Sequence, residues 1–448
     1  MSYDVIVVGA GPAGSTAARY AAKRGLRVLL LDREGEKRIG NKVCGNALGS
    51  HHLREVELEL PNWTNYGRLL GVKIHAPSGR AHLTVETPEY EAIMLDRLRF
   101  GQYLLGLARD AGVELKPDFN ATSAVLVDGK VIGVKGVDVK TMEKLEFEAN
   151  ITIDASGVAG VLKRSMMVIG LDFALDNDET MVTYREIRRL TAPQDPTYAD
   201  IFLDMDVAPG GYWWLFPMGK EMINVGVGVV KGSVNPRVAF EKILKRNKLL
   251  DNSSVLHCGG GIVPTRRPMA TMVWNGIVFI GDAGFTVNPL HGGGIGSSML
   301  AGRIAGEVLA EATIRGDFSI KGLWPMNLRY MESYGAKQAS LDVMRIFLQG
   351  LNNEIINYGI EHQLIKQEDL LATSMGSDLR LNITEKAQRV FSGIGRIGFL
   401  LKLNRAAELM RSFKRMYVQY PKDPNEFESW IKAATSLHEI IHKDLGQN

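Results

Sequence analysis

Three glycines near the start of the chain have the spacing of a dinucleotide-binding turn. Gly9, Gly11 and Gly14 form the pattern G-x-G-x-x-G directly after the apolar stretch 5–8 and ahead of a helix-like segment. The first glycine of such a turn allows a tight bend, the second lets the backbone approach a pyrophosphate, and the third lets helix and strand pack closely. Asp32, at the end of the next apolar stretch, supplies a carboxylate that can accept hydrogen bonds from ribose hydroxyls. The pattern predicts a site for an adenine dinucleotide, against the alternative of a structural glycine turn with a solvated aspartate.

A second carboxylate-and-glycine segment lies much later in the chain. Asp282 follows the apolar stretch 277–280, and the glycines of 292–296 precede a helix-like segment. This arrangement resembles the second FAD fingerprint of the flavoprotein hydroxylase superfamily, in which the aspartate holds a ribityl hydroxyl and the helix start directs backbone N–H groups at the flavin. The stretch from Asp154 to Gly157 resembles the middle D-G motif of that superfamily more loosely, because it lacks the downstream S-x-x-R. Three such segments in this order, separated by a β-rich insertion, imply FAD rather than NAD.

Aromatic side chains and a cysteine form the remaining candidates for chemistry. Tyr212, Trp214 and Phe216 alternate in the segment Y-W-W-L-F-P, which is followed by N-V-G-V-G. Such aromatics can wall an apolar cavity at the flavin, and they can equally fill the core of an antiparallel sheet. Cys44 lies on a glycine-containing loop, where a free cysteine is more often an inert buried hydrophobe than a reactive group. We interpret Cys258 as an inert buried residue of that kind.

The elements that must position these residues are predicted from local patterns. The strand–turn–helix–strand order over 4–31 is typical of a doubly wound parallel sheet, and the aromatic strands of 181–230 indicate an antiparallel sheet. Further predicted elements are a hairpin over 69–85, a helix over 95–111, a meander over 123–139, a buried strand at 151–154 and a long helix over 294–315. The fold class we expect is α/β, with a Rossmann-like FAD-binding domain, an inserted antiparallel β-sheet substrate domain and a C-terminal helical region. The predicted boundaries are 1–68, 95–170 and 265–323 for the discontinuous FAD-binding domain, 69–94 and 171–264 for the substrate domain, and 324–448 for the helical region.

Composition excludes several classes of function. The 448 residues carry 53 Lys and Arg against 50 Asp and Glu, a formal charge of +3, which disfavours a nucleic-acid partner. The 2 cysteines cannot supply the thiolates of an iron–sulfur cluster or a Cys-rich zinc site, so we expect no metal centre and a reducing cytoplasm. The N-terminus lacks the features of a signal peptide, and the uncharged run 283–302 is too rich in glycine and proline for a spanning helix.

Taken together, these stretches resemble the archaeal geranylgeranyl reductases, flavoenzymes that saturate the isoprenoid chains of archaeal ether lipids. The matching stretches are 3–24, 44–48, 95–100, 154–157, 211–228 and 281–302. The C-G loop combined with Y-x-W-x-F-P and N-V-G-x-G is the most specific part of the match. Two departures are Gly101, where relatives often carry Asp, and Phe285, where hydroxylases commonly carry His.

The resemblance implies a set of site residues. The implied FAD contacts, beyond the glycine turn, are Ala13, Gly14, Asp32, Arg33, Cys44, Gly45, Arg97, Ala121, Asp282, Gly294 and Ile295, with Ala121 acting through its backbone beside the adenine. The implied reaction is hydride transfer from reduced flavin to one carbon of an isoprenoid C=C, with a proton delivered to the other. Tyr212, Trp214 and Phe216 fit the aromatic wall that would favour carbocation-like character, and Cys44 is the candidate for placing or relaying the proton, with water as its competitor.

The expected partners are a long-chain isoprenoid lipid and an external electron donor, either a ferredoxin or NAD(P)H. Peripheral contact with the inner face of the cell membrane is expected through the segment 385–420, which holds two acids, Glu385 and Glu408. Its basic residues are Lys386, Arg389, Arg396, Lys402, Arg405, Arg411, Lys414 and Arg415, and its apolar residues include Phe391, Ile394, Ile397, Phe399, Leu400, Leu403 and Phe413. The alternative is a solvated basic helix face over an ordinary core.

Two other functions remain open at the level of sequence. Y-x-W-x-F-P also resembles the W-x-W-x-I-P segment of flavin-dependent halogenases, so a monooxygenase or halogenase is one alternative. An electron-transfer flavoprotein that passes electrons to a quinone is another, although the 2 cysteines argue against an attached iron–sulfur cluster.

Overall fold

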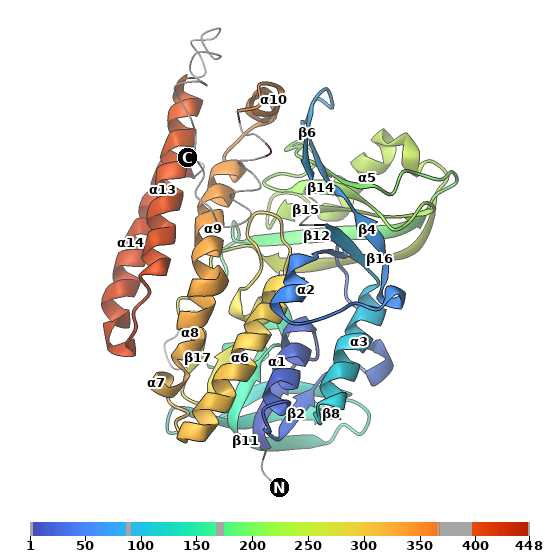
Figure 1. Cartoon of the computed structure of the whole chain (residues 1–448). Coiled ribbons are helices and arrows are strands. Elements are labelled where there is room, and N and C mark those ends of the chain that lie inside the picture. Colours follow the sequence, from blue (N-terminus) through green and yellow to red (C-terminus); the bar gives the residue numbers. More distant parts are fainter. Residues whose placement is uncertain (1–2, 87–90, 167–173, 365–366, 368–396, 447–448) are drawn as a thin grey trace.

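The first strands of the chain form the centre of a parallel sheet. The computed structural model describes residues 3–86, 91–166, 174–364, 367 and 397–446 (Figure 1). β1 (Tyr3–Val8) and β2 (Val28–Leu31) are apolar runs that are largely buried, as expected for strands covered on both faces. The sheet order is β17 (Val273–Trp274), β18 (Ile277–Phe279), β11 (Lys144–Asp154), β1, β2 and β8 (Glu114–Lys116), with β10 (Lys130–Asp138) pairing with β11 and with β9 (Phe119–Val127).

Three helices lie together against this sheet. They are α1 (Pro12–Ala22), α3 (Arg97–Asp110) and α6 (Ile295–Arg315), which Figure 1 shows side by side. The close approach of α1 and α6 depends on glycine, because a Cβ on Gly302 would lie 2.4 Å from the Ala13 carbonyl oxygen, and a Cβ on Gly306 would lie 2.6 Å from Tyr20 Cβ. The starts of α1 and α6, which carry the two glycine segments, are thereby held close to each other.

A seven-stranded sheet forms the second layer. Its order is β16 (Ser254–Pro264), β12 (Thr180–Arg189), β15 (Met222–Val230), β14 (Tyr212–Pro217), β13 (Tyr198–Phe202), β5 (Gly71–His75) and β6 (His82–Glu86), and every pair except β13–β5 is antiparallel. α5 (Pro236–Arg246) covers one face, where Phe240 and Ile243 share a core with Leu215, Val225 and Val227. In Figure 1 this sheet lies between α5 and the helices of the first layer.

A small three-stranded sheet adjoins these two layers. It consists of β3 (Ala47–Gly49), β7 (Ala92–Leu95) and β4 (Asn65–Leu69), with the short helix α2 (His51–Glu55) after β3. The hairpin predicted over 69–85 is present as β5 and β6, but Leu69 belongs to β4, because Leu69 pairs with Ala92 of β7.

The described helices in the last part of the chain share the first core. The described helices are α7 (Ile320–Leu323), α8 (Pro325–Tyr330), α9 (Ala336–Gln349), α10 (Asn353–Glu361), α13 (Ile397–Val418) and α14 (Phe427–Leu445), and α4 (Val161–Ser165) lies earlier in the chain. Ala406 and Phe413 of α13 belong to the same hydrophobic cluster as Ile6 and Phe347. The C-terminal helices are therefore packed into the core of the first layer.

The predicted fold class is confirmed, including the α/β arrangement, the antiparallel sheet and the C-terminal helices. The predicted helices over 95–111 and 294–315 correspond to α3 and α6, and the predicted meander over 123–139 corresponds to β9 and β10. In the described part of the chain, none of the helices is both long enough and apolar enough to cross a bilayer.

Candidate active site

The first glycine turn has the backbone geometry that its sequence predicts. Gly9 adopts φ +102°, and a Cβ there would lie 2.3 Å from the Ala155 carbonyl oxygen, so only glycine fits. A Cβ on Gly14 would lie 1.8 Å from the Gly9 carbonyl oxygen, which shows how closely the start of α1 packs on the turn. Gly11 has no atom within 4 Å of its Cβ position, so the turn is open on the side from which a pyrophosphate would approach.

The carboxylate of Asp32 is tied to this turn. Its Oδ2 accepts a hydrogen bond from the backbone N–H of Ala10 at 2.7 Å, and its Oδ1 accepts one from that of Glu34 at 2.8 Å. Burial raises the pKa of Asp32, while these two hydrogen bonds oppose the rise. The neighbouring Arg33 points into solvent, with 73% of its side chain exposed and Glu34 at 3.9 Å. Ala121, in β9, is buried.

Arg97 carries unpaired hydrogen-bond donors in a buried position. It is the first residue of α3 and is 7% exposed, yet its Nε and one terminal nitrogen, NH1, have no hydrogen-bond partner within the described structure. Unpaired buried donors are expensive, so a guanidinium in this state indicates a place for an anion. A second cation, Lys42, lies near Arg97, because the charge of Arg97 acts to lower the pKa of Lys42.

The second glycine segment brings Asp282 to the same region. Asp282 lies in a short 3₁₀ turn after β18, and its Oδ2 accepts a hydrogen bond from Lys42 Nζ at 2.9 Å. The charge of Asp282 is the main cause of the raised pKa of Lys42. Gly294 precedes α6, and Ile295 is the first residue of that helix and is buried. A Cβ on Gly281 would lie 3.0 Å from Ala13 Cβ, so the two glycine segments face each other.

These residues fit FAD on structural grounds. The open side of Gly11 and the two cations, Arg97 and Lys42, suit a pyrophosphate, while Asp32 and Asp282 suit the hydroxyls of a ribose and a ribityl chain. The N-terminus of α6 presents backbone N–H groups beyond Gly294, where the positive end of the helix favours negative charge.

Two further residues organise this cradle from the middle motif. The fully buried carboxylate of Asp154 accepts hydrogen bonds from the backbone N–H groups of Ser156, Leu162 and Lys163. Lys163 Nζ donates to the Ala283 carbonyl oxygen at 2.8 Å, beside Asp282, and burial lowers its pKa to about 7. Lys163 was not predicted from the sequence, because its contact with the Ala283 carbonyl joins segments that are far apart in the chain.

The three predicted aromatics lie on one face of the seven-stranded sheet, opposite α5. Strand pairing aligns Tyr212 with Gly228, Trp214 with Gly226 and Phe216 with Asn224, and residues directly opposite in adjacent strands share a face. The ring centroids of Tyr212 and Trp214 are 5.9 Å apart, as are those of Trp214 and Phe216. The alternation of Y-x-W-x-F therefore produces a continuous aromatic surface.

Glycines leave space beside this aromatic surface. At Gly226 the space for a side chain is already occupied, because a Cβ there would lie 2.3 Å from Trp214 Cζ2 and 2.6 Å from Arg185 Cβ. At Gly228 a methyl group would fit, because the nearest side-chain atoms, Thr183 Cγ2 and Met181 Cε, lie 3.6 Å and 3.7 Å from the Cβ position. Gly228 and Gly261 lie on either side of Thr183 in one row of the sheet, and Tyr212 lies in the same row on β14, so Thr183 is the side chain between Tyr212 and the edge strand β16.

The aromatic face is joined to both loops of the cradle. Asn224 donates from Nδ2 to the Cys44 carbonyl oxygen at 2.9 Å and accepts from Trp214 Nε1 at 3.1 Å. A Cβ on Gly45 would lie 3.2 Å from Phe216 Cε2. Tyr212 donates from its hydroxyl to the His291 carbonyl oxygen at 2.6 Å, on the loop before α6. Burial raises the pKa of Tyr212, so its phenol stays protonated at neutral pH.

Cys44 lies at this junction. Its Sγ accepts a hydrogen bond from the backbone N–H of Asn46 at 3.3 Å, which is made by a turn in which Asn46 adopts φ +70°. Cys44 packs against the cluster containing Leu48 and Ile295. The structure thus brings Cys44 close to the aromatic strand and to the start of α6.

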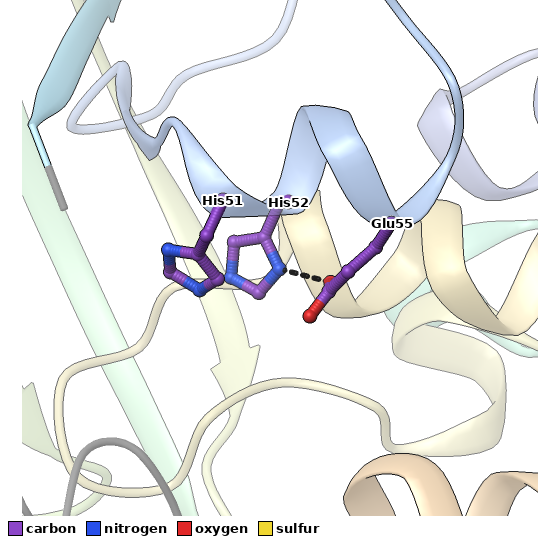
Figure 2. Close-up of side chains that lie close together, drawn as sticks. All are labelled: His51, His52 and Glu55. Atoms are coloured by element: carbon purple, nitrogen blue, oxygen red, sulfur yellow. Dashed lines mark hydrogen bonds and ion pairs between the residues drawn. The ribbon is translucent and has the colours of Figure 1, made fainter. Parts of the chain in front are cut away.

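The His52 ring, from α2, lies on the glycine-rich start of α6. His51, His52 and Glu55 lie on α2 with their side chains close together (Figure 2), and His52 Nδ1 lies 2.8 Å from Glu55 Oε2. A Cβ on Gly296 would lie 2.1 Å from the His52 ring, so that glycine is required for the ring to lie on α6. Burial lowers the pKa of His51 to about 4, which keeps its imidazole neutral. Within the described residues, no further His, Cys, Asp or Glu side chain joins this group as a close potential ligand.

One prediction about the cysteines is wrong. Cys258 is exposed rather than buried. It lies on β16 at the edge of the seven-stranded sheet, opposite Glu186, and therefore points to the face away from the aromatic residues.

The predicted lipid-binding segment also needs correction. Residues 385–396 lie outside the described residues, and the remaining basic residues lie on α13. Leu403 and Phe413 were expected on an apolar membrane-facing side, but they are 3% and 1% exposed and belong to the protein core. Their spacing reflects the packing of α13 against α9.

A cavity of about 390 Å³ beside α2 shares no residue with the site described above. It is lined by Ser50, Leu53, Arg54, Leu58, Glu59, Leu60, Asn62, Asn65, Arg68, Glu91 and Ile93.

Comparison with known proteins identifies two matching families. Residues 4–185 match the family described as FAD dependent oxidoreductase, and residues 179–263 match the geranylgeranyl reductase catalytic domain. The second match covers β12 to β16 almost completely and thus includes the aromatic face. The N-terminal match covers the first glycine turn, Asp32, Cys44 and Arg97.

Curated relatives match over the whole chain. The digeranylgeranylglycerophospholipid reductase of Sulfolobus acidocaldarius is 40% identical over 99% of this chain and 99% of its own length, and that of Methanothrix thermoacetophila is 32% identical over 83% of this chain and 94% of its own. Among solved structures, a geranylgeranyl bacteriochlorophyll reductase-like protein from Thermoplasma acidophilum has a TM-score of 0.75 at 27% identity, covering 80% of this chain and 91% of that one. The myxobacterial chondrochloren halogenase, at 18% identity and a TM-score of 0.64 over 99% of this chain and 97% of that one, shares the fold alone. This chain belongs to the digeranylgeranylglycerophospholipid reductase family.

Proposed function

We propose that this protein is an FAD-dependent reductase that saturates C=C bonds of geranylgeranyl chains in the synthesis of archaeal membrane ether lipids. The observation that carries this proposal is the aromatic, glycine-lined face of the seven-stranded sheet, joined to the FAD cradle through Asn224 and Tyr212. It agrees with the full-length similarity to digeranylgeranylglycerophospholipid reductases.

The cofactor is FAD, which when bound and reduced supplies the hydride. Gly9, Gly11 and Gly14 shape the turn for its pyrophosphate, and Arg97 contributes the buried charge that offsets it. Asp32 and Asp282 accept hydrogen bonds from the ribose and ribityl hydroxyls. Gly294 and Ile295 begin the helix whose N-terminus stabilises negative charge on the flavin ring. The remaining proposed contacts are Ala13, Arg33, Cys44, Gly45 and Ala121.

The substrate surface suits an isoprenoid chain. Tyr212, Trp214 and Phe216 exclude water and present aromatic faces, which stabilise positive charge that develops on a protonated alkene. The row through Gly228 and Gly261 leaves room for the methyl-branched chain beside these rings. A long apolar substrate gains binding energy mainly from such buried contact.

Cys44 is the proposed proton donor, acting at the carbon that does not receive the hydride. An isolated trisubstituted alkene is a poor hydride acceptor, so protonation runs with or ahead of hydride transfer. The contact between Asn224 and the Cys44 carbonyl holds the thiol beside the aromatic strand. Water then returns a proton to the sulfur, which restores the thiol for the next turnover.

The electron donor is a ferredoxin or NAD(P)H, and the protein works at the cytoplasmic face of the membrane that holds its substrate. The basic residues of α13, together with the exposed Leu401 and Val418, support peripheral contact with anionic lipids. Flotation of the full chain with anionic vesicles tests this contact, and absence from the vesicle fraction at low salt would contradict it.

An anaerobic single-turnover experiment tests the function. The FAD-loaded protein is reduced with dithionite, a geranylgeranyl phospholipid is added, and flavin absorbance and lipid mass are followed together. We expect flavin reoxidation with a mass gain of two hydrogens per double bond reduced. Reoxidation only in air, with an oxygenated or halogenated product, would indicate the monooxygenase or halogenase alternative. Reoxidation by a quinone, without lipid reduction, would indicate electron transfer.

A further inference from the structure

The short helix α2 carries two adjacent histidines and a glutamate on one side. His51, His52 and Glu55 are the first, second and last of its five residues. An α-helix turns by about 100° per residue, so Glu55 lies between the two histidines, about 40° around the axis from His51 and about 60° from His52. The pattern H-H-x-x-E therefore places two imidazoles and one carboxylate on a single face of the helix.

The donor atoms of these three side chains lie close together (Figure 2). One ring nitrogen of each histidine and one carboxylate oxygen of Glu55 all lie within 4.8 Å of one another, and His52 Nδ1 is 2.8 Å from Glu55 Oε2. Zn²⁺ binds His nitrogen and carboxylate oxygen at about 2.0–2.2 Å, so the ligand atoms around one ion are about 3.3 Å apart. The terminal torsions of His and Glu are soft, so modest rotations bring the three donors to that separation.

Glycines let both rings lie against the backbone. A Cβ on Gly49 would lie 2.7 Å from His51 Cε1, and a Cβ on Gly296 would lie 2.1 Å from His52 Cδ2. The two ring centroids are 4.0 Å apart, so the rings also contact each other. None of the three side chains is fully buried, so an ion can enter from solvent. Ligands that are already gathered in this way lose little conformational entropy on binding.

The donor set indicates the class of metal. Imidazole suits Zn²⁺ and other late transition metals, whereas Ca²⁺ and Mg²⁺ prefer sites made of oxygen ligands. Three protein ligands leave a coordination position for water. The absence of a metal centre expected from the sequence rests on the 2 cysteines and does not concern a site of histidine and carboxylate. Lys337 of α9 is a nearby cation that interacts with Glu55, so removing its charge should favour an ion at this place.

We propose that His51, His52 and Glu55 form a binding site for one divalent transition-metal ion of the Zn²⁺ class. The inference goes beyond the proposed reductase function and does not depend on it. The ion joins the first, second and last residues of a helix that is far too short to be stable alone. Because the His52 ring lies on Gly296, the second residue of α6, the ion also fixes α2 against the start of that helix.

The test measures Zn²⁺ binding directly. Full-length, FAD-loaded protein without a histidine tag is stripped of metal and then titrated with Zn²⁺ in competition with a chromophoric chelator, and metal analysis after gel filtration gives the stoichiometry. We expect one Zn²⁺ per chain. H51Q and E55Q should each weaken binding at least tenfold, because even the loss of a second-sphere partner of a metal ligand costs about 10- to 100-fold. K337M should bind Zn²⁺ more tightly than the parent.

H75Q is the matched control, because His75 also lies beside a second histidine and a carboxylate. Its Nε2 is 2.6 Å from Asp200 Oδ1 and its ring centroid is 5.3 Å from that of His82, yet within the described residues these side chains do not form a group of three close donors. H75Q should bind Zn²⁺ like the parent protein.

Two results would overturn the proposal: a parent protein that retains no Zn²⁺ after gel filtration, or unchanged affinity in both H51Q and E55Q. If these variants do not fold, X-ray absorption of the parent with one equivalent of Zn²⁺ decides instead. We expect two imidazoles and oxygen ligands at about 2.0–2.2 Å. A sulfur ligand at about 2.3 Å, or fewer than two imidazoles, would place the ion elsewhere and overturn the proposal.

Discussion

At the scale of single residues, the two unpaired nitrogens of Arg97 make a direct prediction about FAD affinity. Hydrogen bonds between a charged donor and acceptor contribute about 1.5–3 kcal/mol, and each 1.4 kcal/mol changes an equilibrium constant about tenfold. R97M should therefore weaken FAD binding by about 10- to 100-fold, while R97K recovers part of the loss. Fluorescence titration of the apoprotein with FAD measures both.

Arg99 provides the control for this prediction. It lies two residues further along α3 with 62% of its side chain exposed, and it is held by Asp96 and the Trp63 carbonyl. R99M should bind FAD like the parent protein. If R97M also bound FAD with unchanged affinity, Arg97 would have no role at the pyrophosphate.

Individual residues differ in how far the sequence predicts them. The glycine turn and Asp32 follow from local spacing, because the residues that form the turn are close in the chain. Lys42 and Asn224 were missed, because their roles depend on contacts with Asp282 and with the Cys44 carbonyl from distant segments. The alternation N-V-G-V-G was a usable signal, since it places Asn224 on the face of the aromatics.

At the scale of elements, alanine substitutions of two nearby glycines of β15, Gly226 and Gly228, should affect different kinetic constants. Gly226 is in contact with Trp214 and Arg185, so G226A must displace the aromatic ring and should lower kcat at least tenfold. Gly228 accommodates a methyl group at ordinary contact distance, so G228A should fold, bind FAD normally and raise KM for the lipid several-fold by reducing the space beside the aromatic surface. Steady-state kinetics with a geranylgeranyl phospholipid separate the two effects.

V227A is the control on the same strand, because Val227 faces α5 in the core on the other side of the sheet. It should lower stability by about 0.5–2 kcal/mol while leaving KM unchanged in the folded protein. If G226A and G228A changed kcat and KM equally, the lipid would not contact the row of the sheet that contains Gly228 and Gly261.

Element types were easier to predict than their pairing. The 95–111 and 294–315 helices were found because their periodic patterns are long. The three-stranded sheet was not found, because β3, β4 and β7 are short and β7 pairs across more than twenty residues of intervening hairpin. Cys258 was misjudged for a related reason, since nothing in the sequence of β16 shows that it lies at a sheet edge.

At the scale of the whole molecule, buried charges tie the C-terminal helices to the rest of the protein. Glu179, directly before β12, accepts from Arg266 at 2.6 Å and from Arg267 at 2.5 Å. Arg267 also lies 3.7 Å from Asp342 of α9 and donates to His438 Nε2 of α14 at 3.0 Å. Breaking such a buried network leaves charges uncompensated, so the C-terminal helices are expected to unfold together with the layers they contact.

This network predicts how stability depends on pH. Arginine only donates, so His438 Nε2 must be unprotonated to accept from Arg267, and burial together with Arg267 lowers the pKa of His438 to about 3. The unfolded chain then binds more protons than the folded one below its ordinary pKa of about 6.5, so stability falls as pH decreases from about 6.5 towards 3. The loss from this group is about 2 kcal/mol at pH 5 relative to pH 7.5.

The variant H438Q isolates this contribution, because glutamine can still accept from Arg267 but does not titrate. Urea unfolding at several pH values should show a smaller decrease between pH 7.5 and 5 in H438Q than in the parent. His51 and His291, whose pKa values burial lowers to about 4, titrate in both proteins and cancel in the comparison. If stability fell equally in the two proteins, the prediction would be wrong. His438 would then be protonated in the folded state at acidic pH, where its contact with Arg267 would be broken.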